Sequence, residues 1–275
     1  MRHAVCFTIW GTRSSVPSAA AAGRFGIHTT CFTLETPDAL VIMDAGTGLG
    51  SVSRNLSASS RPRPIRMILT HAHLDHISGL PPFPPLYARG RPIPVMAAPA
   101  QLAKIRAGVR TILSPPLWPV PWQQSCARLQ FTPLPPAGRP WRIGPARLTW
   151  CPVWHPQGCI ALRIEAAGRT LVVATDREPG RPAFDAPFRD FCRGADWLIL
   201  DAQYTPQEAL QRSGWGHGNW QEAASLAREC AVGSLVLTHH DQHRDAAGIA
   251  AIVRDARKIF PATRAATSGM RFVLG

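Results

Sequence analysis

The stretch LTHAHLDHISG, residues 69–79, restricts what this chain can fold into more than any other feature of the sequence. It follows an apolar run that is typical of a buried strand, and within six positions it holds His71, His73, Asp75 and His76. Imidazole nitrogens and carboxylate oxygens are ligands for zinc, iron or manganese. The alternative is an exposed polar loop, but such a loop has no reason to follow a strand in this order. The stretch therefore predicts a metal site.

Short runs rich in β-branched and aromatic residues, each bounded by Gly, Pro, Asp or Thr, predict strands along most of the chain. They lie at 5–10, 29–35, 39–46, 66–71, 147–153, 159–166, 170–176, 197–202, 234–240 and 270–275. Helical periodicity occurs near residues 99–113, 218–231 and 245–258. Strands with helices interspersed favour a pair of sheets flanked by helices over a helical bundle.

Two of these runs lead into similar polar clusters, which indicates two related halves. RMILTHAHLDH (66–76) and SLVLTHHDQH (234–243) are both apolar strands that end in Thr-His, and three other strands end on an aspartate: Asp44, Asp176 and Asp201. We expect both halves to deliver ligands from strand ends to one shared edge, where a rigid sheet fixes the site and loops carry the chemistry.

Four clustered residues cannot complete the coordination of two metal ions, so later strand ends must supply more ligands. The candidates are His155 in VWHPQG, Asp176 in VVATD, and either His239 or His240 in VLTHHDQH. Asp176 could bridge two ions with its two oxygens. Two ions about 3.5–4 Å apart would activate a bridging water and clamp both oxygens of a displacement.

Composition limits the class of protein and its partners. The chain has 275 residues, of which 45% are hydrophobic, so it can bury a sizeable core, and we expect one domain over residues 1–275. A net charge of +13 favours anionic partners: nucleic acid, nucleotides or an acidic surface. The arginines are scattered, however, and a GC-rich genome would give the same bias, so charge alone is a weak indication of nucleic-acid binding.

The seven cysteines form no Cys-x-x-Cys pair, and we expect reduced, buried thiols in a cytoplasmic protein. No apolar run approaches the roughly 20 residues that span a bilayer, so no membrane segment is expected. The proline-rich segment 81–145 carries Phe83, Tyr87, Trp118, Trp122 and Trp141 among its aromatic residues, which a flexible linker would not need. We expect it to form an ordered wall beside the site, with a helix near 99–113. Residues 18–23, SAAAAG, are expected to be a mobile loop.

Further motifs give the chain a resemblance to a known family. They are GTRSSVP (11–17), DAGTGL (44–49), HPQG (155–158), ATD (174–176), DAQYT (201–205) and GWGH (214–217). Together with the histidine-rich stretch, they resemble the metallo-β-lactamase-fold hydrolases over nearly the full length. Within these, the chain is similar to the branch of ribonuclease Z and related phosphodiesterases. It departs from the bacterial subgroup with a GTRGS-like start at Ser14, which replaces a glycine, and at His28, which replaces an asparagine.

The resemblance implies an α/β fold, the αββα four-layer sandwich of the metallo-β-lactamase type. It implies two divalent metal ions, for which zinc is the best fit to the ligand types and manganese or iron at one position are the alternatives. One ion would be held by His71, His73 and His155, and the other by Asp75, His76 and His239, with Asp176 bridging. His239 is preferred over His240 because it directly follows LVLT. Asp44 is expected to anchor the loops and not to bind metal.

The implied chemistry is hydrolysis by a metal-bridging hydroxide, with Asp75 helping to orient the water. In the ribonuclease Z-like branch, an acidic residue at a strand end pairs with a histidine that opens a later helix, and the matching residues here are Asp201 and His217. A carboxylate that orients a cationic imidazole can stabilise phosphoryl charge and help protonate the leaving oxygen. This pair favours a phosphodiesterase. The alternative role of His217 is to cap a helix beside a glycine-rich turn.

The expected substrate is an anionic small molecule, a nucleotide or an RNA end. Because no long basic arm for gripping tRNA is evident, a small phosphodiester is favoured over tRNA. The alternative function is hydrolysis of a lactone, a thioester or another carboxylic derivative, since the fold alone does not choose the substrate. Arg13, Arg24 and His28 could contact the non-scissile part of the substrate, and His243 and Asp245 could support the last ligand. Family members are often dimers, so a homodimer is a further expectation.

Overall fold

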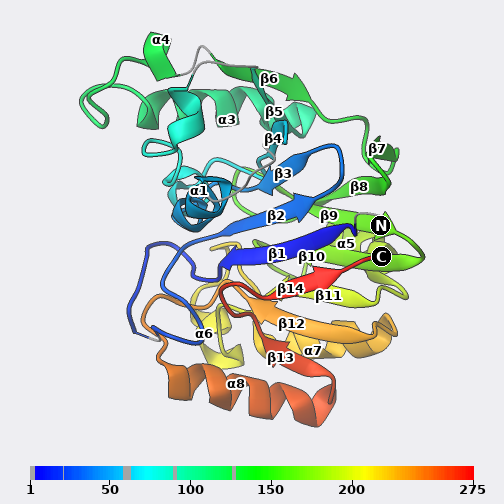
Figure 1. Cartoon of the computed structure of the whole chain (residues 1–275). Coiled ribbons are helices and arrows are strands. Elements are labelled where there is room, and N and C mark those ends of the chain that lie inside the picture. The colour runs from blue at the N-terminus through cyan, green and yellow to red at the C-terminus, as the bar shows by residue number, and fades with distance from the viewer. Residues whose placement is uncertain (1–3, 21, 58–62, 89–91, 126–127) are drawn as a thin grey trace.

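The computed structural model describes residues 4–20, 22–57, 63–88, 92–125 and 128–275. The described residues form two seven-stranded sheets (Figure 1). The first sheet has the strand order β14 (Arg271–Val273), β1 (Cys6–Gly11), β2 (Cys31–Glu35), β3 (Leu40–Met43), β4 (Ile65–Ile68), β5 (Ile93–Ala97) and β6 (Leu129–Pro133). The second has the order β13 (Thr263–Ala265), β12 (Ser234–Thr238), β11 (Trp197–Asp201), β10 (Arg169–Ala174), β9 (Cys159–Ala166), β8 (Ala146–Val153) and β7 (Trp141–Ile143).

The two sheets repeat one pattern of strand directions. In the first, β1, β2 and β3 are antiparallel neighbours, and β3 to β6 are parallel. In the second, β8, β9 and β10 are antiparallel neighbours, and β10 to β13 are parallel. The expectation of two related halves is therefore confirmed at the level of topology. The sequence echo paired the wrong strands, however, because it matched β4 with β12, whereas the topological equivalent of β4 is β11.

Apolar side chains between the two sheets form the central core, and two further cores lie under helices on the outer faces. The helices α1 (Leu49–Ser57) and α3 (Pro99–Ile112) cover the first sheet. The helices α5 (Pro182–Cys192), α7 (Trp220–Glu229) and α8 (Ala246–Ile259) cover the second (Figure 1). This is the αββα four-layer sandwich that the resemblance implied.

The sequence pattern explains why each helix buries one face. The α3 residues Ile105 and Val109 are fully buried at a spacing of four, and α8 buries Ile249, Ile252 and Ala256 at helical spacing. Burying each Ile or Val side chain stabilises the fold by about 1.5–3 kcal/mol. Three helices predicted from periodicity are present close to their expected bounds, as α3, α7 and α8.

The short elements α2 (Leu74–Ile77), α4 (Trp122–Ser125), α6 (Pro206–Gln211) and the 3-10 helix η1 (Pro84–Leu86) lie in connections. The helices α1 and α5 and the strands β5, β6, β7 and β13 were not predicted from the sequence. β7 and β13 have only three residues each, and β5 and β6 each contain a proline, which weakens the strand signal.

The described part of the proline-rich segment is ordered, as expected, and holds β5, α3, α4, β6 and β7. Its helix α3 lies beside the histidine-rich loop. Lys104 Nζ donates to the carbonyl of Gln157 at 3.1 Å, and a side chain added at Gly108 would lie 3.1 Å from the Ala72 Cβ. This segment is therefore a wall of the site.

The remaining expectations from composition concern cysteines, membranes and one loop. The six described cysteines are buried free thiols, and Cys126 lies outside the described residues. In the part of the chain that the structure describes, no helix is long and apolar enough to cross a membrane. Ser18 in the 18–23 loop donates its hydroxyl to the Gln242 carbonyl, so this end of the loop is anchored. The mobility of the loop stays a prediction.

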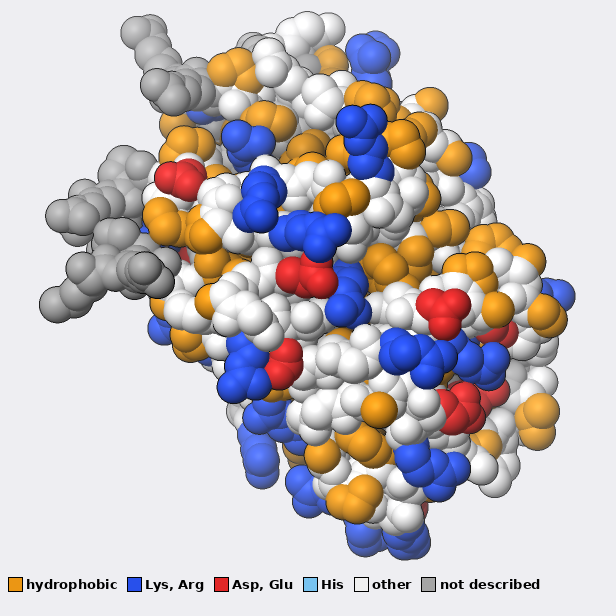
Figure 2. All heavy atoms as spheres, turned by 90° about the vertical axis from the view of Figure 1, so that its right-hand side faces the viewer, with side chains coloured by type: hydrophobic (Ala, Val, Ile, Leu, Met, Phe, Trp, Pro, Cys, Tyr) orange, Lys and Arg blue, Asp and Glu red, His pale blue; other side chains and the backbone are white. Residues whose placement is uncertain are grey.

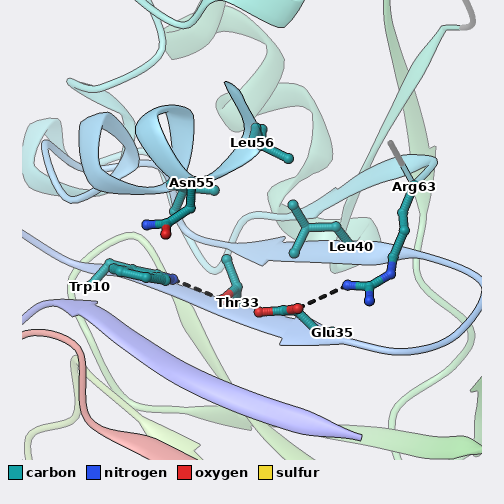
Figure 3. A pocket seen from close by; sticks show the side chains of 8 residues that line it. Trp10, Thr33, Glu35, Leu40, Asn55, Leu56 and Arg63 are labelled. Atoms are coloured by element: carbon teal, nitrogen blue, oxygen red, sulfur yellow. Dashed lines mark hydrogen bonds and ion pairs between the residues drawn. The ribbon is translucent and has the colours of Figure 1, made fainter. Parts of the chain in front are cut away.

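A small hollow of about 80 Å³ lies between α1 and the outer face of β1, β2 and β3 (Figure 3). The Trp10 indole donates to Thr33 across it at 2.8 Å, and Arg63 pairs with Glu35 at 2.8 Å. Because Glu35 ends β2 and β2 is antiparallel to β3 and β1, this pair lies at the end of the sheet opposite to the histidine-rich loop. The hollow is therefore separate from the predicted metal site.

Gly46, in the loop after β3, lets two loops of the site pack closely, which generates a prediction. A Cβ on Gly46 would lie 2.1 Å from the Asp75 carbonyl oxygen. We expect Gly46→Ala to lower the free energy of unfolding by about 1–3 kcal/mol, measured by urea denaturation. The control is Gly50→Ala in α1, where the only close atom is Arg54 Nη1 at 4.0 Å and alanine improves helix propensity. Equal stability of the two variants would contradict close packing at Gly46.

Candidate active site

The site lies where the carboxyl ends of the parallel strands meet. His71 follows β4, His155 follows β8, Asp176 follows β10 and His239 follows β12. His239, the first residue after β12, has a left-handed backbone conformation with φ +60°. Such a conformation costs a residue other than glycine about 1–3 kcal/mol. The surrounding fold therefore holds the His239 ring in one direction at the expense of backbone strain.

Asp44 fixes the direction of the histidine-rich loop, as the sequence suggested. Its carboxylate accepts the Thr70 amide at 2.8 Å, the Thr70 hydroxyl at 2.9 Å and His76 Nδ1 at 2.8 Å. Because Nδ1 of His76 donates to Asp44, its Nε2 faces the other side, toward Asp75 and Asp176. Burial alone would lower the pKa of His76, but the carboxylates of Asp176, Asp75 and Asp44 raise it well above the ordinary value.

One cluster brings together His71, His73, His155 and Asp176, whose ligand atoms lie within 4.8 Å of one another. His155 Nδ1 donates to the Gly216 carbonyl at 2.8 Å, which leaves Nε2 facing His73 Nδ1 at 3.0 Å. Burial lowers the pKa of His155 to about 4 and lowers the pKa of His71 well below its usual value. Both rings are therefore neutral near pH 7, the state in which imidazole binds metals.

The second cluster contains Asp75, His76, Asp176 and His239. His239 Nε2 lies 3.1 Å from Asp75 Oδ2, and the same oxygen accepts the Ser15 amide at 2.8 Å. Burial would lower the pKa of His239, but Asp176 and the hydrogen bond to Asp75 raise it to about 9. The amide of Ser15 ties the GTRSSVP loop to this cluster.

Asp176 belongs to both clusters and presents one oxygen to each. Its Oδ2 lies 3.7 Å from His71 Nε2 and 3.8 Å from His155 Nε2. Its Oδ1 lies 3.1 Å from His76 Nε2 and 3.5 Å from His239 Nε2. Burial would raise the pKa of Asp176, but His239, His76 and His71 hold it well below the ordinary value, so the carboxylate is ionised.

Divalent metal fits this donor set, judged by atoms that lack a well-directed hydrogen bond. Among the described residues, His71 Nε2 is buried and neither accepts nor donates a hydrogen bond, and His76 Nε2 and Asp176 Oδ1 face each other at 3.1 Å as an ion pair without one. A buried polar group that is not hydrogen-bonded costs about 1–3 kcal/mol, so three such atoms in one place need an explanation. Imidazole and carboxylate ligands directed at a common point are what zinc, iron or manganese require. All seven predicted ligands are brought together, and the role of each remains a prediction.

Asp201 and His217 also meet at this edge. His217 Nδ1 donates to Asp201 Oδ2 at 2.9 Å, and Asp201 Oδ1 accepts the Gln203 amide at 2.9 Å. The His217 ring stacks on the His239 ring with a centroid distance of 5.0 Å, and the buried Tyr204 ring lies edge-on at 5.9 Å. The pair is therefore held directly beside the second cluster. The same geometry means that Asp201, His217 and His239 could also hold an ion.

The predicted supporting residues have other roles in the structure. Arg13 was expected to contact substrate, but it is fully buried and donates to the carbonyls of Gly26, Asp241 and Arg244. Asp245 caps α8 by accepting the Gly248 amide at 2.7 Å. His243 is exposed, and only its backbone amide bonds to Asp241. Among the described residues, neither the His243 ring nor the Asp245 carboxylate bonds to His239, so these two residues do not support the last ligand.

His240 and His28 also lie outside the two clusters. His240 is buried, and its ring meets the Phe25 ring edge-on at 6.2 Å. Burial and the nearby Arg13 lower the pKa of His240 to about 3, so it is a neutral packing residue. His28 is partly buried, and its carbonyl accepts the amides of Thr12 and Arg13 at 3.0 Å each. Arg24 is exposed and lies over the Phe25 ring.

Sequence reasoning missed Glu178, which follows Asp176 by two positions. Its carboxylate is buried and accepts the Gly214 amide at 2.8 and 3.0 Å and the Gly216 amide at 2.7 Å. Gly216 in turn accepts His155 Nδ1, and a Cβ there would lie 2.1 Å from that nitrogen. Glu178 therefore positions both His155 and the neighbouring His217. The only sequence signal was its place next to the ATD motif.

This arrangement generates a second prediction. In Glu178→Gln, an oxygen in the place of Oε2 can still reach both glycine amides, but it accepts more weakly than a carboxylate, and the new NH2 group faces the Gly214 N–H at the place of Oε1. We expect this donor–donor contact and the lost charge to cost about 1–3 kcal/mol. We expect faster hydrogen exchange over residues 212–219, measured by mass spectrometry. The matched control is Glu222→Gln, whose carboxylate takes only the Asn219 side-chain amide. Unchanged exchange in Glu178→Gln would show that other contacts hold the loop.

Comparisons with known proteins agree with this geometry. The chain is 28% identical over 277 residues to a ribonuclease Z of Bradyrhizobium sp. (strain ORS 278), covering 82% of this chain and 87% of that protein. The metallo-beta-lactamase fold protein YhfI from Bacillus subtilis superposes with a TM-score of 0.74 and 21% identity, covering 98% of each chain. A diphosphatase from the PhnP family gives a TM-score of 0.71 with 16% identity, covering 98% of this chain and 97% of that one.

With sequence identities of 21% and 16%, the two solved structures show the fold alone. Their fold is the one that was expected from the sequence. The resemblance to ribonuclease Z is confirmed by the relative from Bradyrhizobium, and it agrees with the expected class of metal-dependent hydrolase. The family model described as beta-lactamase superfamily domain matches residues 40–240, from β3 to the second histidine after β12. Because this match covers most of the chain, the protein belongs to the beta-lactamase superfamily.

Proposed function

We propose that the protein is a dinuclear metal-dependent phosphodiesterase that acts on a nucleotide or RNA phosphodiester. His71, His73 and His155 would hold one divalent cation, and Asp75, His76 and His239 the other, with one oxygen of Asp176 for each. Zinc suits this mixture of imidazole and carboxylate ligands. Two such cations supply Lewis acidity and lower the pKa of a water molecule toward neutrality.

The observation that carries the proposal is the Asp201–His217 pair beside the shared carboxylate of Asp176. Asp201 orients the His217 ring through Nδ1, and His217 Nδ1 also lies 3.8 Å from Asp176 Oδ2. The opposite ring nitrogen of His217 is therefore free to face a substrate. A protonated imidazole in that place would stabilise charge on a phosphoryl oxygen and give its proton to the departing oxygen.

The choice of a phosphodiester rests on this pair and on the ribonuclease Z relative, which matches most of this chain. A nucleotide or RNA phosphodiester gains from a cationic donor for its oxygens and needs a proton for its departing alkoxide. A lactone keeps its leaving group tethered after ring opening, so it depends less on His217. Hydrolysis of a lactone or thioester is the alternative outcome of the experiments below.

The first experiment measures steady-state hydrolysis of bis(p-nitrophenyl) phosphate by the zinc-loaded protein. We expect turnover that is lost in Asp176→Ala, because both clusters lose their common ligand. Zinc content, measured on the same samples, should fall from two ions per chain to one or none. Absence of turnover in wild-type protein that holds two ions would reject the phosphodiesterase and favour the lactone or thioester alternative.

The second experiment tests His217 with His217→Gln, which keeps a polar side chain of similar size. We expect kcat for a dinucleotide phosphodiester, whose departing alkoxide needs a proton, to fall by about 10²–10⁴, the usual contribution of a positioned acid. The kcat for bis(p-nitrophenyl) phosphate, whose p-nitrophenolate departs as an anion, should fall by less. Zinc content should stay at the wild-type level, which separates a catalytic loss from a loss of metal. His243→Gln is the matched control, because His243 is exposed and bonds only through its backbone. Equal losses on a lactone substrate would remove the distinction between the two functions.

A further inference from the structure

An arginine-lined hollow lies outside the two clusters. It has a volume of about 750 Å³ and lies between α8, β13 and the loop of residues 23–25. Four exposed arginines from these three elements line it: Arg24, Arg254, Arg257 and Arg264. Thr267 adds a hydroxyl along the same wall, and Ser268 lines it with a hydroxyl that donates to the Trp10 carbonyl at 3.2 Å. The hollow therefore gathers positive charge and hydrogen-bond donors from segments that are far apart in the sequence.

This charge is largely unneutralised. No Asp or Glu lines the hollow, and among the described residues Arg24, Arg257 and Arg264 have no carboxylate partner. Arg24 lies over the Phe25 ring and Arg264 over the Phe272 ring, which orients both without cancelling their charge. Only Arg254 has an acidic neighbour, with its Nε 3.6 Å from Asp255.

Arginines elsewhere on the surface are mixed. Some pair with acids, as Arg147 does with Glu165 at 3.3 Å and Arg169 with Asp196 at 2.7 Å, whereas others, such as Arg66 and Arg142, form no ion pair among the described residues. Figure 2 shows Lys and Arg side chains interspersed with Asp and Glu on the face turned toward the viewer. What distinguishes the hollow is that four exposed arginines lie together there with no acidic side chain in its lining.

The hollow adjoins the metal clusters through its walls. Phe25, which lines it, packs edge-on against His240, and His240 directly follows His239. On the opposite wall, Ala266 donates its amide to the Leu237 carbonyl at 2.7 Å, and Thr267 and Ser268 follow. The hollow thus reaches the same edge of the second sheet as the clusters, with the buried Phe25 and His240 rings between them. It continues along α8 to Arg257 and to Arg264 near the start of β13.

We propose that this hollow binds the phosphodiester backbone of a single-stranded RNA whose scissile bond lies at the metal clusters. Guanidinium groups match phosphate oxygens bidentately and remain charged at every physiological pH. Four exposed arginines spread over three elements suit several successive phosphates, whereas a single phosphate needs converging donors. The inference rests on the proposed function and deepens it, since it extends the substrate from a small phosphodiester to an oligonucleotide.

The test compares two variants that lose the same charge. The hollow variant is Arg24→Gln/Arg254→Gln/Arg264→Gln, which keeps Arg257 because its Nε donates to the Thr263 carbonyl at 2.8 Å. The control variant is Arg66→Gln/Arg142→Gln/Arg228→Gln, three exposed arginines outside the hollow. The probe is a fluorescein-labelled 12-nucleotide RNA with phosphorothioate linkages, which resists hydrolysis, and its Kd is measured by anisotropy between 50 and 200 mM salt.

We expect the Kd to rise at least tenfold in the hollow variant and to change by less than about threefold in the control. The slope of log Kd against log salt should fall by about 2, since each lost phosphate contact on a single strand contributes about 0.7. Cleavage of unmodified RNA relative to bis(p-nitrophenyl) phosphate should drop about tenfold in the hollow variant. A charge-preserving variant, Arg24→Lys/Arg254→Lys/Arg264→Lys, should retain most of the binding.

The remaining outcomes separate this inference from the proposed function. RNA binding that depends on the hollow arginines, in a protein that cleaves no phosphodiester, would keep the binding site and reject the phosphodiesterase. Cleavage of bis(p-nitrophenyl) phosphate with equal RNA affinity in wild type and both variants would overturn the RNA site alone. Inorganic phosphate could displace the RNA at a concentration equal to that of the phosphate groups in the RNA. That result would assign the hollow to a free anion and would also overturn the RNA site.

Discussion

The shared carboxylate of Asp176 is the interaction on which the arrangement of this site depends. One oxygen faces His71 and His155, and the other faces His76 and His239. His71 follows β4, His76 lies in α2 after it, His155 follows β8 and His239 follows β12, so one buried anion gathers groups from both halves of the fold. An ionised carboxylate buried to this degree is tolerated only with compensating partners. The fold therefore has to place several ligands correctly before this one is stable.

The sequence predicted the local part of this site well. His71, His73, Asp75 and His76 lie within one short loop, so their proximity follows from chain connectivity alone. The later ligands are far apart along the chain, and only the rule that parallel strands end at one edge, together with the family resemblance, predicted that His155, Asp176 and His239 would join them. A pair of sheets flanked by helices followed from the strand and helix patterns, because periodicity reports which face of an element is buried, and the family resemblance implied the αββα order of the layers.

What the sequence could not predict depends on contacts between distant segments. Glu178 holds the amides of Gly214 and Gly216, and no local pattern indicates that a carboxylate will meet a loop so far along the chain. Arg13 was misjudged for the same reason. Its position in a loop near the site suggested substrate contact, whereas its burial and three carbonyl acceptors become visible only in the fold. A buried arginine with backbone acceptors ties loops together.

Arg13 also connects the metal clusters to the arginine-lined hollow. Its guanidinium joins the Gly26 carbonyl, at the rim of the arginine-lined hollow, to the carbonyls of Asp241 and Arg244, just after the last histidine of the site. The loop that carries Arg24 is therefore fixed relative to His239. A flexible loop would pay conformational entropy each time it bound a strand, whereas a loop held in this way presents its charge in a constant place. A fixed distance between hollow and clusters would then select which phosphodiester of a bound strand reaches Asp176.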